Sequence, residues 1–433
     1  MKNECGWIAQ VQSAPARDRL SGTQKADWLV IGAGITGLSA AHALAQLHPQ
    51  ARIVVVDRQR AAQGASARNS GFVVAHEHPG NDELIDSPGF AEFEVDTTIS
   101  RAASAEVREM IARHGIACDL KDSGYFFAVS DPRKLTHVEE KLQTLRALGA
   151  SAQFLDGEQL VQKLGTRHYR AAIWCGKGNA LLQPAKYVKG LLDALPPTVT
   201  VYENTDITRL ERLGKGRLRA NGIEGSIEAK QVLVCLNAFV PRAGIQDSGT
   251  FAMELSASLT RPLTDAEFRD MGNVEPWGVL STRPLGATVR LTPDRRVMIR
   301  NTAEYRSRDL STSELSIRRQ HHVLGLQRRF PWLGEQDIHY TWTGHLSASR
   351  SGQPFFSQVE EGVFAVAGCN GSGVARGTLW GRLLAELASG VDSPMLDSVM
   401  RRAQPGWLPP RPLLDIGAML RMRVEAIRAK TEI

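Results

Sequence analysis

The stretch Ala26-Asp-Trp-Leu-Val-Ile-Gly-Ala-Gly-Ile-Thr-Gly-Leu-Ser-Ala-Ala41 joins an apolar run to a glycine turn and then to a helical pattern. Its first part predicts a buried strand, and Gly32, Gly34 and Gly37 occupy the spacing G-x-G-x-x-G. The first glycine permits a tight turn, the second lets the backbone approach a pyrophosphate, and the third lets the helix pack against the strand. The N-terminus of the helix then offers free N–H groups and the positive end of its dipole to phosphates.

An acidic residue follows at the distance that a dinucleotide site requires. A second apolar strand is expected over residues 52–56, and Asp57 ends it, about 20 residues beyond Gly37. A carboxylate at this place accepts hydrogen bonds from ribose hydroxyls and favours a free 2′-OH. The pattern therefore predicts a site for FAD or NAD rather than NADP.

The composition is that of an ordinary globular chain. Of its 433 residues, 42% are hydrophobic and 23% are charged, so two domains are expected. The net charge of +6 is spread along the chain rather than gathered in basic runs with aromatic residues between them. Nucleic-acid binding is therefore not indicated.

The five cysteines are odd in number and scattered, with no C-x-x-C pair. This pattern favours reduced thiols in the cytoplasm over a disulfide framework or a zinc site. No apolar run approaches the length of a transmembrane segment, and the N-terminus does not resemble a secretory signal. His321 and His322 are adjacent in an expected helix and do not share a face, so no metal site is predicted.

A second glycine-containing segment, Gln63-Gly-Ala-Ser-Ala-Arg-Asn-Ser-Gly-Phe72, follows the second strand. Together with the opening stretch it resembles the flavin-binding signature of the D-amino-acid-oxidase-like family of FAD oxidoreductases. In that family the first motif holds the ADP half of FAD, and the second passes beside the isoalloxazine ring. Ala67 and Ser70 stand where the family usually has glycines.

A third glycine cluster lies far along the chain. A strand is expected over 363–367, and Gly368-Cys-Asn-Gly-Ser-Gly-Val-Ala375 then opens a helix. This resembles the family form G-x-x-G-x-G-V/F, in which the helix dipole faces the flavin edge that gains negative charge on reduction. A nicotinamide enzyme has no need of this third cluster, so FAD is favoured over NAD.

The resemblance implies which residues hold FAD. In relatives the backbone near Ile207 meets the adenine, Asn237 lies near the pyrophosphate, and Gly344 belongs to a strand of the form Y-x-W-x-G. No cysteine stands where the sarcosine oxidase branch attaches flavin, so the FAD is expected to be non-covalent. The implied cofactor residues are Gly32, Gly34, Ile35, Thr36, Gly37, Asp57, Arg58, Ser66, Ala67, Arg68, Asn69, Ser70, Ile207, Asn237, Gly344, Gly368, Asn370, Gly371, Ser372, Gly373 and Val374.

The fold implied is of the α/β class, a doubly wound Rossmann-like FAD-binding domain with an inserted α+β mixed-sheet substrate domain. The FAD-binding domain is expected to comprise residues 26–90, 182–240 and 341–395, and the substrate domain 91–181 and 241–340. Residues 1–25 form an N-terminal arm. Residues 396–433 form a C-terminal helical tail, expected to pack on the FAD-binding domain, with peripheral membrane contact as the alternative.

Substrate contacts are predicted at Arg300, Arg290, Tyr125 and His345. The segment 287–301 resembles a family hairpin in which two glycines stand at the places of Arg300 and Asn301. An arginine there could pair a substrate carboxylate through its planar fork, or could be a surface arginine at a hairpin end. Arg290 could do the same or belong to an internal ion pair, and Tyr125 could line a pocket or the core of a sheet.

The hairpin at residues 287–301 and the C-terminal tail resemble those of γ-glutamylputrescine oxidases and related bacterial amine and imino-acid oxidases. This implies that a CH–NH bond in a carboxylate-bearing amine loses hydride to flavin N5, giving an imine that hydrolyses, with oxygen or a quinone as acceptor. Three alternatives stay open. They are an oxidase or dehydrogenase of a cyclic or D-amino acid such as L-pipecolate, an NAD-dependent dehydrogenase, and a non-catalytic flavoprotein subunit of a larger dehydrogenase.

Overall fold

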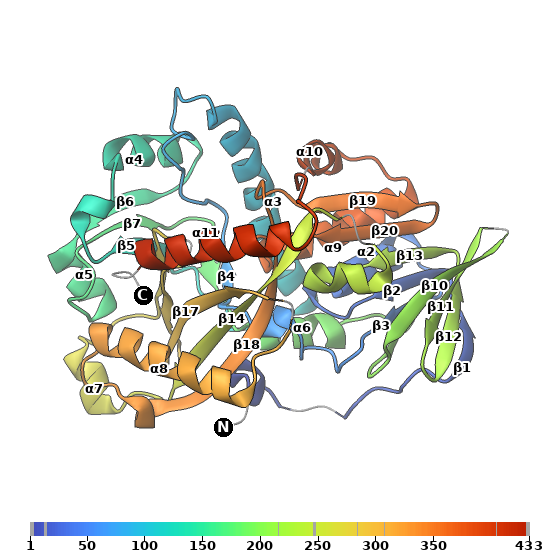
Figure 1. The fold of residues 1–433 in the computed structure, drawn as a ribbon, viewed down its shortest axis with the longest axis horizontal. Coiled ribbons are helices and arrows are strands. Elements are labelled where there is room, and N and C mark those ends of the chain that lie inside the picture. Colours follow the sequence, from blue (N-terminus) through green and yellow to red (C-terminus); the bar gives the residue numbers. More distant parts are fainter. Residues whose placement is uncertain are drawn as a thin grey trace.

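The computed structural model describes residues 4–12, 15–214, 216–245, 248–283, 285–306, 308–403 and 405–429. In these ranges the strands form four sheets, of which a six-stranded and an eight-stranded sheet organise the molecule (Figure 1). The fold class expected from the sequence, α/β with a mixed-sheet second region, is confirmed.

The six-stranded sheet carries the opening motif. Its order is β19-β20-β13-β2-β3-β9, and every strand except the edge strand β19 runs parallel to its neighbours. The central strands are apolar throughout, as expected of a parallel sheet covered on both faces. The strands are β2 (Trp28–Ile31), β3 (Ile53–Val56), β9 (Val199–Tyr202), β13 (Gln231–Val234), β19 (Phe355–Glu360) and β20 (Val363–Ala367).

Helices cover one face of this sheet, and a second sheet covers the other. The helices α2 (Ile35–Leu47) and α9 (Ala375–Ser389) lie together against the first face, with α3 (Phe90–His114) and α6 (Pro184–Asp193) packed around them. The second face is covered by a four-stranded sheet that was not predicted from the sequence, and its apolar side chains pack on β2, β3 and β13. Its strands are β1 (Gly22–Lys25), β10 (Ile207–Gly214), β11 (Arg217–Gly222) and β12 (Gly225–Ala229).

The eight-stranded sheet has the order β18-β14-β17-β16-β15-β5-β7-β6 and is mixed, because β15 and β5 pair in parallel. The helix α8 (Thr312–Arg329) packs on β14 and β17, while α4 (Val138–Ala147) and α5 (Gly157–Leu164) pack on β6. The strands are β5 (Tyr125–Val129), β6 (Ala152–Asp156), β7 (Ala171–Cys175), β14 (Thr250–Thr260), β15 (Gly278–Ser281), β16 (Thr288–Leu291), β17 (Val297–Tyr305) and β18 (Ile338–Ser349).

A small apolar cluster joins the two halves. Met298 and Trp342 from the eight-stranded sheet pack with Ala67 and with Trp7 of the short helix α1 (Gly6–Ala9). The ring centroids of Trp7 and Trp342 are 6.1 Å apart, in an edge-to-face contact. The N-terminal segment is therefore held in the seam between the sheets.

The C-terminal segment corrects one expectation. The helix α10 (Pro394–Arg402) packs on α3 and α9, but α11 (Leu413–Ala429) packs on β17 of the eight-stranded sheet rather than on the nucleotide-binding half (Figure 1). A hydrogen bond of 2.7 Å from Tyr305 Oη to Asp415 Oδ1 anchors it there. None of the helices in the described ranges combines the length and the apolar character that crossing a bilayer requires.

Candidate functional site

The first glycine turn is built so that α2 starts directly against the sheet. Gly32 has φ +109°, and a Cβ on it would lie 2.6 Å from the backbone oxygen of Cys235. A Cβ on Gly37 would lie 1.8 Å from the backbone oxygen of Gly32. Both positions therefore exclude a side chain, and the first N–H groups of α2, which lack partners within the helix, point into the loop.

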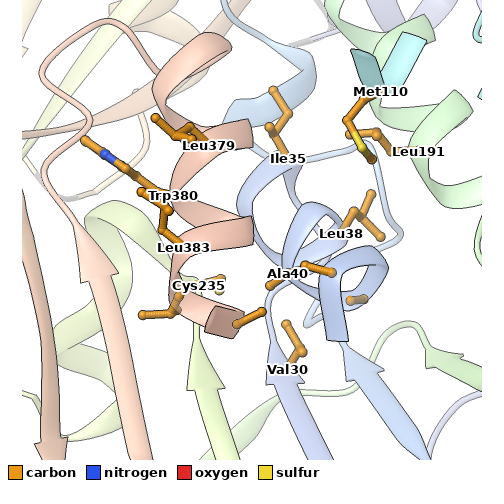
Figure 2. Close-up of a cluster of buried hydrophobic side chains, with 14 of the residues drawn as sticks. Val30, Ile35, Leu38, Ala40, Met110, Leu191, Cys235, Leu379, Trp380 and Leu383 are labelled. Atoms are coloured by element: carbon orange, nitrogen blue, oxygen red, sulfur yellow. The ribbon is translucent and has the colours of Figure 1, made fainter. Parts of the chain in front are cut away.

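The third glycine cluster, at residues 368–373, brings α9 alongside α2. Its loop holds three residues in the left-handed region, Gly368 (φ +78°), Asn370 (φ +47°) and Gly371 (φ +95°). A Cβ on Gly381 would lie 2.3 Å from the backbone oxygen of Thr36, so the helices touch backbone to backbone at this point. Figure 2 shows the two helices side by side above the strands, with Leu379, Trp380 and Leu383 on the side of α9 that points away from α2.

The N-terminal ends of α2 and α9 open onto one cavity of about 710 Å³, which the eight-stranded sheet closes on its other side. Pockets for small-molecule ligands commonly have volumes of about 300–1,000 Å³. The structure thus brings together glycine motifs that are separated by most of the chain. The predicted cofactor residues that line the cavity are Gly34, Ile35, Thr36, Ser66, Arg68, Asn69, Ser70, Asn237, Gly344, Asn370, Gly371, Ser372, Gly373 and Val374.

The loop at residues 64–71 is tied down by its own polar groups. The amide of Asn69 is used within it, because Nδ2 donates to the Ser66 oxygen at 2.7 Å and Oδ1 accepts from the Gly71 N–H at 2.8 Å. Arg68 donates through Nε to the Gln63 oxygen at 2.7 Å. Ser66 Oγ accepts from the Ile35 N–H at 2.9 Å, which joins this loop to the start of α2.

Other predicted cofactor residues lie outside the cavity lining. The Asp57 carboxylate accepts backbone N–H groups of Ala33 and Gln59, both at 2.8 Å, and so braces the first turn. Burial raises the pKa of Asp57. Ile207 begins β10 in the four-stranded sheet. Contacts of these residues with a nucleotide stay predictions, and the full set outside the lining is Gly32, Gly37, Asp57, Arg58, Ala67, Ile207 and Gly368.

Arg300 faces the cavity with an unbalanced charge. Its Nη2 donates to Thr288 Oγ1 at 2.6 Å, whereas Nη1 is buried and has no hydrogen-bond partner among the described residues. No carboxylate of the described ranges forms an ion pair with it. Burial lowers the pKa of Arg300 to about 10, so the guanidinium is still charged at neutral pH. An uncompensated buried charge is costly, and an anionic ligand would offset that cost.

Arg290 is not placed as predicted for a substrate-binding residue. It does not line the cavity and forms no ion pair within the described ranges, and its Nη1 donates to the backbone oxygens of Ser70 at 2.7 Å and Leu182 at 2.9 Å. Its guanidinium carbon lies 5.1 Å from the ring centroid of Trp7. Arg290 is therefore a buried tie between three segments and is not placed to contact a substrate.

Tyr125 and His345 both line the cavity, but their surroundings limit the protons that they can donate. The Tyr125 hydroxyl already donates to the backbone oxygen of His76 at 2.6 Å, and burial raises its pKa well above the ordinary value. Burial also lowers the pKa of His345, which favours the neutral ring. Its Nδ1 lies 3.8 Å from Asp309, and Nε2 has no hydrogen-bond partner in the described part of the chain.

Within the described ranges, one group of side chains is close enough together to hold a metal ion. It comprises Glu254, Asp309 and His345, whose ligand atoms lie within 4.8 Å of one another. Arg306 already places a guanidinium 3.9 Å from Glu254, and Asp309 is largely exposed. A cation from the protein thus stands beside the buried carboxylate of this group.

Several residues that line the cavity were not among the predicted site residues. His78 stacks on Phe127 with ring centroids 3.9 Å apart, and burial lowers the pKa of His78 to about 3. From β14, Met253 and Leu255 reach the cavity on alternate positions. That alternation was readable in the sequence, but which face of the strand meets a ligand was not.

Residues 27–387 match the protein family described as FAD dependent oxidoreductase (DAO). The chain belongs to this family. Its cofactor is accordingly FAD, as the two glycine clusters predicted. Among similar proteins, γ-glutamylputrescine oxidoreductase of Escherichia coli (strain K12) is 27% identical over 376 residues, which is 86% of each chain. The probable oxidoreductase OrdL of Rhizobium meliloti (strain 1021) is 26% identical, over 89% of this chain and 88% of that one.

Solved structures share the fold. Glycine oxidase from Geobacillus kaustophilus has a TM-score of 0.69 at 17% identity, covering 86% of this chain and 96% of that one. L-Proline dehydrogenase from P. horikoshii also has a TM-score of 0.69 at 17% identity, with 88% and 98% covered. Each of these two structural alignments therefore covers most of this chain and nearly the whole of the solved structure.

The geometry of the cavity is suited to FAD, independently of the family match. Two helix N-termini present backbone N–H groups and positive dipole ends to it, which suits a pyrophosphate and an electron-rich ring edge. Gly34 and Gly371 carry no side chain at the two helix entrances, and no heavy atom lies within 4 Å of a Cβ built on Gly371. The first entrance would hold the pyrophosphate, and residues 371–374 would lie along the flavin.

Proposed function

We propose that this protein oxidises a CH–NH bond in a carboxylate-bearing amine, with γ-glutamylputrescine-like compounds as the first candidates. The unpaired guanidinium of Arg300 in the cavity carries this proposal. The similarity to γ-glutamylputrescine oxidoreductase supports the choice of candidates. Bound FAD supplies the chemistry of hydride acceptance, and the protein supplies binding and orientation.

The charges around the cavity favour an anionic substrate. Arg68, Arg283 and Arg300 line it, and the one carboxylate among its described lining residues is Glu77. Glu77 is already engaged, because Arg376 Nη2 and Ser372 Oγ each lie 3.0 Å from its Oε1. A substrate carboxylate can therefore form a charge-assisted, two-pronged contact with Arg300 without displacing a protein acid.

The remaining wall shields the reacting carbon from water. Phe72, Tyr125 and Phe127 are aromatic, and Met253 and Leu255 are aliphatic. Because the Tyr125 hydroxyl is occupied and His78 is held neutral by burial, no strong acid faces the substrate amine from this wall. An amine that enters unprotonated would keep its lone pair, which hydride loss from the adjacent carbon requires.

Two other functions stay open. An oxidase or dehydrogenase of a cyclic or D-amino acid such as L-pipecolate would also use Arg300, with its carboxylate closer to the reacting carbon. A non-catalytic flavoprotein subunit would bind FAD and would not be reduced by any amine. The NAD-dependent alternative is excluded by the family assignment.

An anaerobic visible spectrum of the purified protein distinguishes these functions. We expect a yellow protein whose absorbance near the flavin maximum is bleached by γ-glutamylputrescine. Bleaching by L-pipecolate alone would move the substrate class to cyclic amino acids, and bleaching by neither would contradict the proposal. Following oxygen uptake and reduction of a soluble quinone analogue in parallel identifies the acceptor.

Replacing Arg300 tests the substrate carboxylate. For Arg300→Met we expect KM for a carboxylate-bearing amine to rise by about 30- to 1,000-fold, because about 2–4 kcal/mol of charge pairing is lost. Oxidation of putrescine, which has no carboxylate, should change little. Arg269→Met, an arginine replacement on the exposed helix α7 (Asp265–Asp270), is the matched control. Equal losses for both amines would refute a role in carboxylate binding.

We also propose that the protein works in a reducing compartment, the cytoplasm. All five cysteines are free thiols, and burial raises the pKa values of Cys5, Cys118, Cys175 and Cys235. Such thiols are inert and form no structural disulfide. Fractionation of cells producing the protein tests this location.

A further inference from the structure

The helix α11 has an apolar stripe that no described part of the chain covers. Leu413, Ile416, Leu420, Val424 and Ile427 follow helical spacing along it. Their side chains are between 46% and 74% exposed, Val424 least and Ile427 most. Residues three and four apart share a helix face, so the five form one continuous stripe pointing away from the protein.

The charges of α11 are sorted between its two sides. Asp415 and Glu425 face the protein, with side chains 32% and 19% exposed. At roughly 100° per residue, Arg421 and Arg428 flank one edge of the stripe and Arg423 flanks the other. The three arginines are exposed, so the outer side of the helix is apolar along its middle and cationic along both edges.

Two further features suit a lipid surface. Trp407, in the segment that leads into α11, is 70% exposed, and tryptophan favours the boundary between headgroups and acyl chains. The chain also carries a net charge of +6, which attracts anionic surfaces. In Figure 1, α11 lies at the front of the molecule.

We propose that α11 docks this protein on an anionic membrane surface. The apolar stripe would enter the boundary between headgroups and acyl chains, and Arg421 and Arg423 would contact lipid phosphates, while Arg428 is paired with Glu425 at 3.0 Å. A hydrophobic protein groove or a second copy of the chain would satisfy the stripe equally well. Neither would require arginines on both edges, whereas an anionic lipid surface pairs with Arg421 on one edge and with Arg423 on the other.

Vesicle sedimentation of the full-length, FAD-loaded protein tests the proposal. One set of vesicles is phosphatidylcholine alone, and the other is an equal mixture with phosphatidylglycerol. We expect the protein to sediment with the mixed vesicles, to bind the neutral vesicles far more weakly, and to be released by high salt because screening weakens the arginine contacts. No binding to either set, or equal binding to both, would overturn the proposal.

Substitutions in α11 test whether this helix is responsible for vesicle binding. Leu420→Glu together with Val424→Glu should abolish sedimentation, because two charges would have to enter the apolar layer. The matched control is Ile223→Glu, an 82% exposed apolar residue between β11 and β12, which should bind as the wild type does. Arg421→Gln with Arg423→Gln should weaken partitioning about 30-fold, about fivefold for each arginine.

Two readouts separate membrane docking from misfolding and from self-association. Flavin absorbance per protein and far-UV circular dichroism should be unchanged in every variant, since the substituted side chains point outward. Analytical ultracentrifugation of the wild type and of the Leu420→Glu, Val424→Glu double variant detects self-association through the stripe. If the wild type is a dimer and the double variant is a monomer, membrane docking is overturned and the stripe is an interface with a second copy of the chain. Unaltered sedimentation of that variant with mixed vesicles would overturn it too.

Discussion

Arg290 and Arg300 lie on neighbouring strands and, by the register of β16 and β17, on the same face of one sheet. Their surroundings give them opposite roles. Arg290 Nη1 donates to two backbone oxygens, those of Ser70 and Leu182, and only its Nε is buried without a partner among the described residues, whereas Arg300 makes one hydrogen bond and leaves Nη1 without a partner beside a cavity. A guanidinium that is buried and bonded stabilises the fold, and one that is buried and unpaired costs stability.

Paired substitutions should therefore separate stability from substrate binding. Arg290→Met leaves two buried carbonyls without a donor, and we expect it to lower the free energy of unfolding by about 2–4 kcal/mol. It should leave the KM of the folded fraction unchanged. Arg300→Met removes an uncompensated charge, so we expect its Tm to equal or exceed that of the wild type while KM rises. Scanning calorimetry with steady-state kinetics checks both, and a lowered Tm for Arg300→Met would refute the unpaired-charge argument.

At the scale of elements, the contact between α2 and α9 positions both helix N-termini on the cavity. The glycines at the crossing are what allow it, because a methyl group on Gly381 would meet the backbone of Thr36 and Ala40 at 2.3 and 2.8 Å. Backbone atoms cannot turn aside as a flexible side chain can. The spacing of the two helices is thus set by a position that does not itself line the cavity, although Thr36 and Trp380 beside it do.

We expect Gly381→Ala to push α9 off α2 and to destabilise the protein by about 1–3 kcal/mol. The FAD site should loosen with it, seen as a higher dissociation constant for FAD in fluorescence titration. Gly417→Ala is the matched control, since a Cβ there meets no heavy atom within 4 Å, and it should be neutral or stabilise by up to about 1 kcal/mol. Identical behaviour of the two variants would contradict close packing at the crossing.

At the scale of the whole molecule, burial of neutral histidines predicts acid sensitivity. His42 and His322 are almost fully buried, and burial lowers their pKa values to about 4 and about 3. Both rings are neutral in the folded protein at pH 5, whereas in the unfolded chain they take up protons below about pH 6.5. The unfolded state binds more protons in this range, so stability falls as pH falls from about 6.5 towards 4.

Lowering the pH from 7 to 5 should reduce the free energy of unfolding by roughly 2 kcal/mol for each of these histidines. His322 is held by Ser258 Oγ at 2.8 Å and Ser256 Oγ at 3.2 Å, so His322→Asn should remove its share of the pH dependence. His137→Asn, at a half-exposed position, is the control and should leave the pH dependence of stability unchanged. Urea denaturation at both pH values measures this, and an unchanged slope for His322→Asn would contradict the assignment.

Local steric demands were readable in the sequence. The strand, glycine turn and helix at residues 28–47 and the matching cluster at 368–389 were predicted because glycine spacing and apolar periodicity act over a few residues. The family resemblance carried the fold class and the cofactor, and the comparisons confirm both. The four-stranded sheet covering the second face went unpredicted, because its strands are half exposed and lack the continuous apolar runs of β2 and β3.

The tertiary structure decided which side chains those motifs serve. From the sequence, Arg290 and Arg300 were similar candidates for binding a substrate carboxylate. Their roles differ only because different segments pack above each strand. Likewise, an amphipathic tail was evident from the sequence, but packing decided that its acidic side meets β17 and its apolar stripe faces outward. Backbone conformation is dictated by neighbouring residues, whereas burial and charge pairing depend on segments that are hundreds of residues apart and meet only in the folded protein.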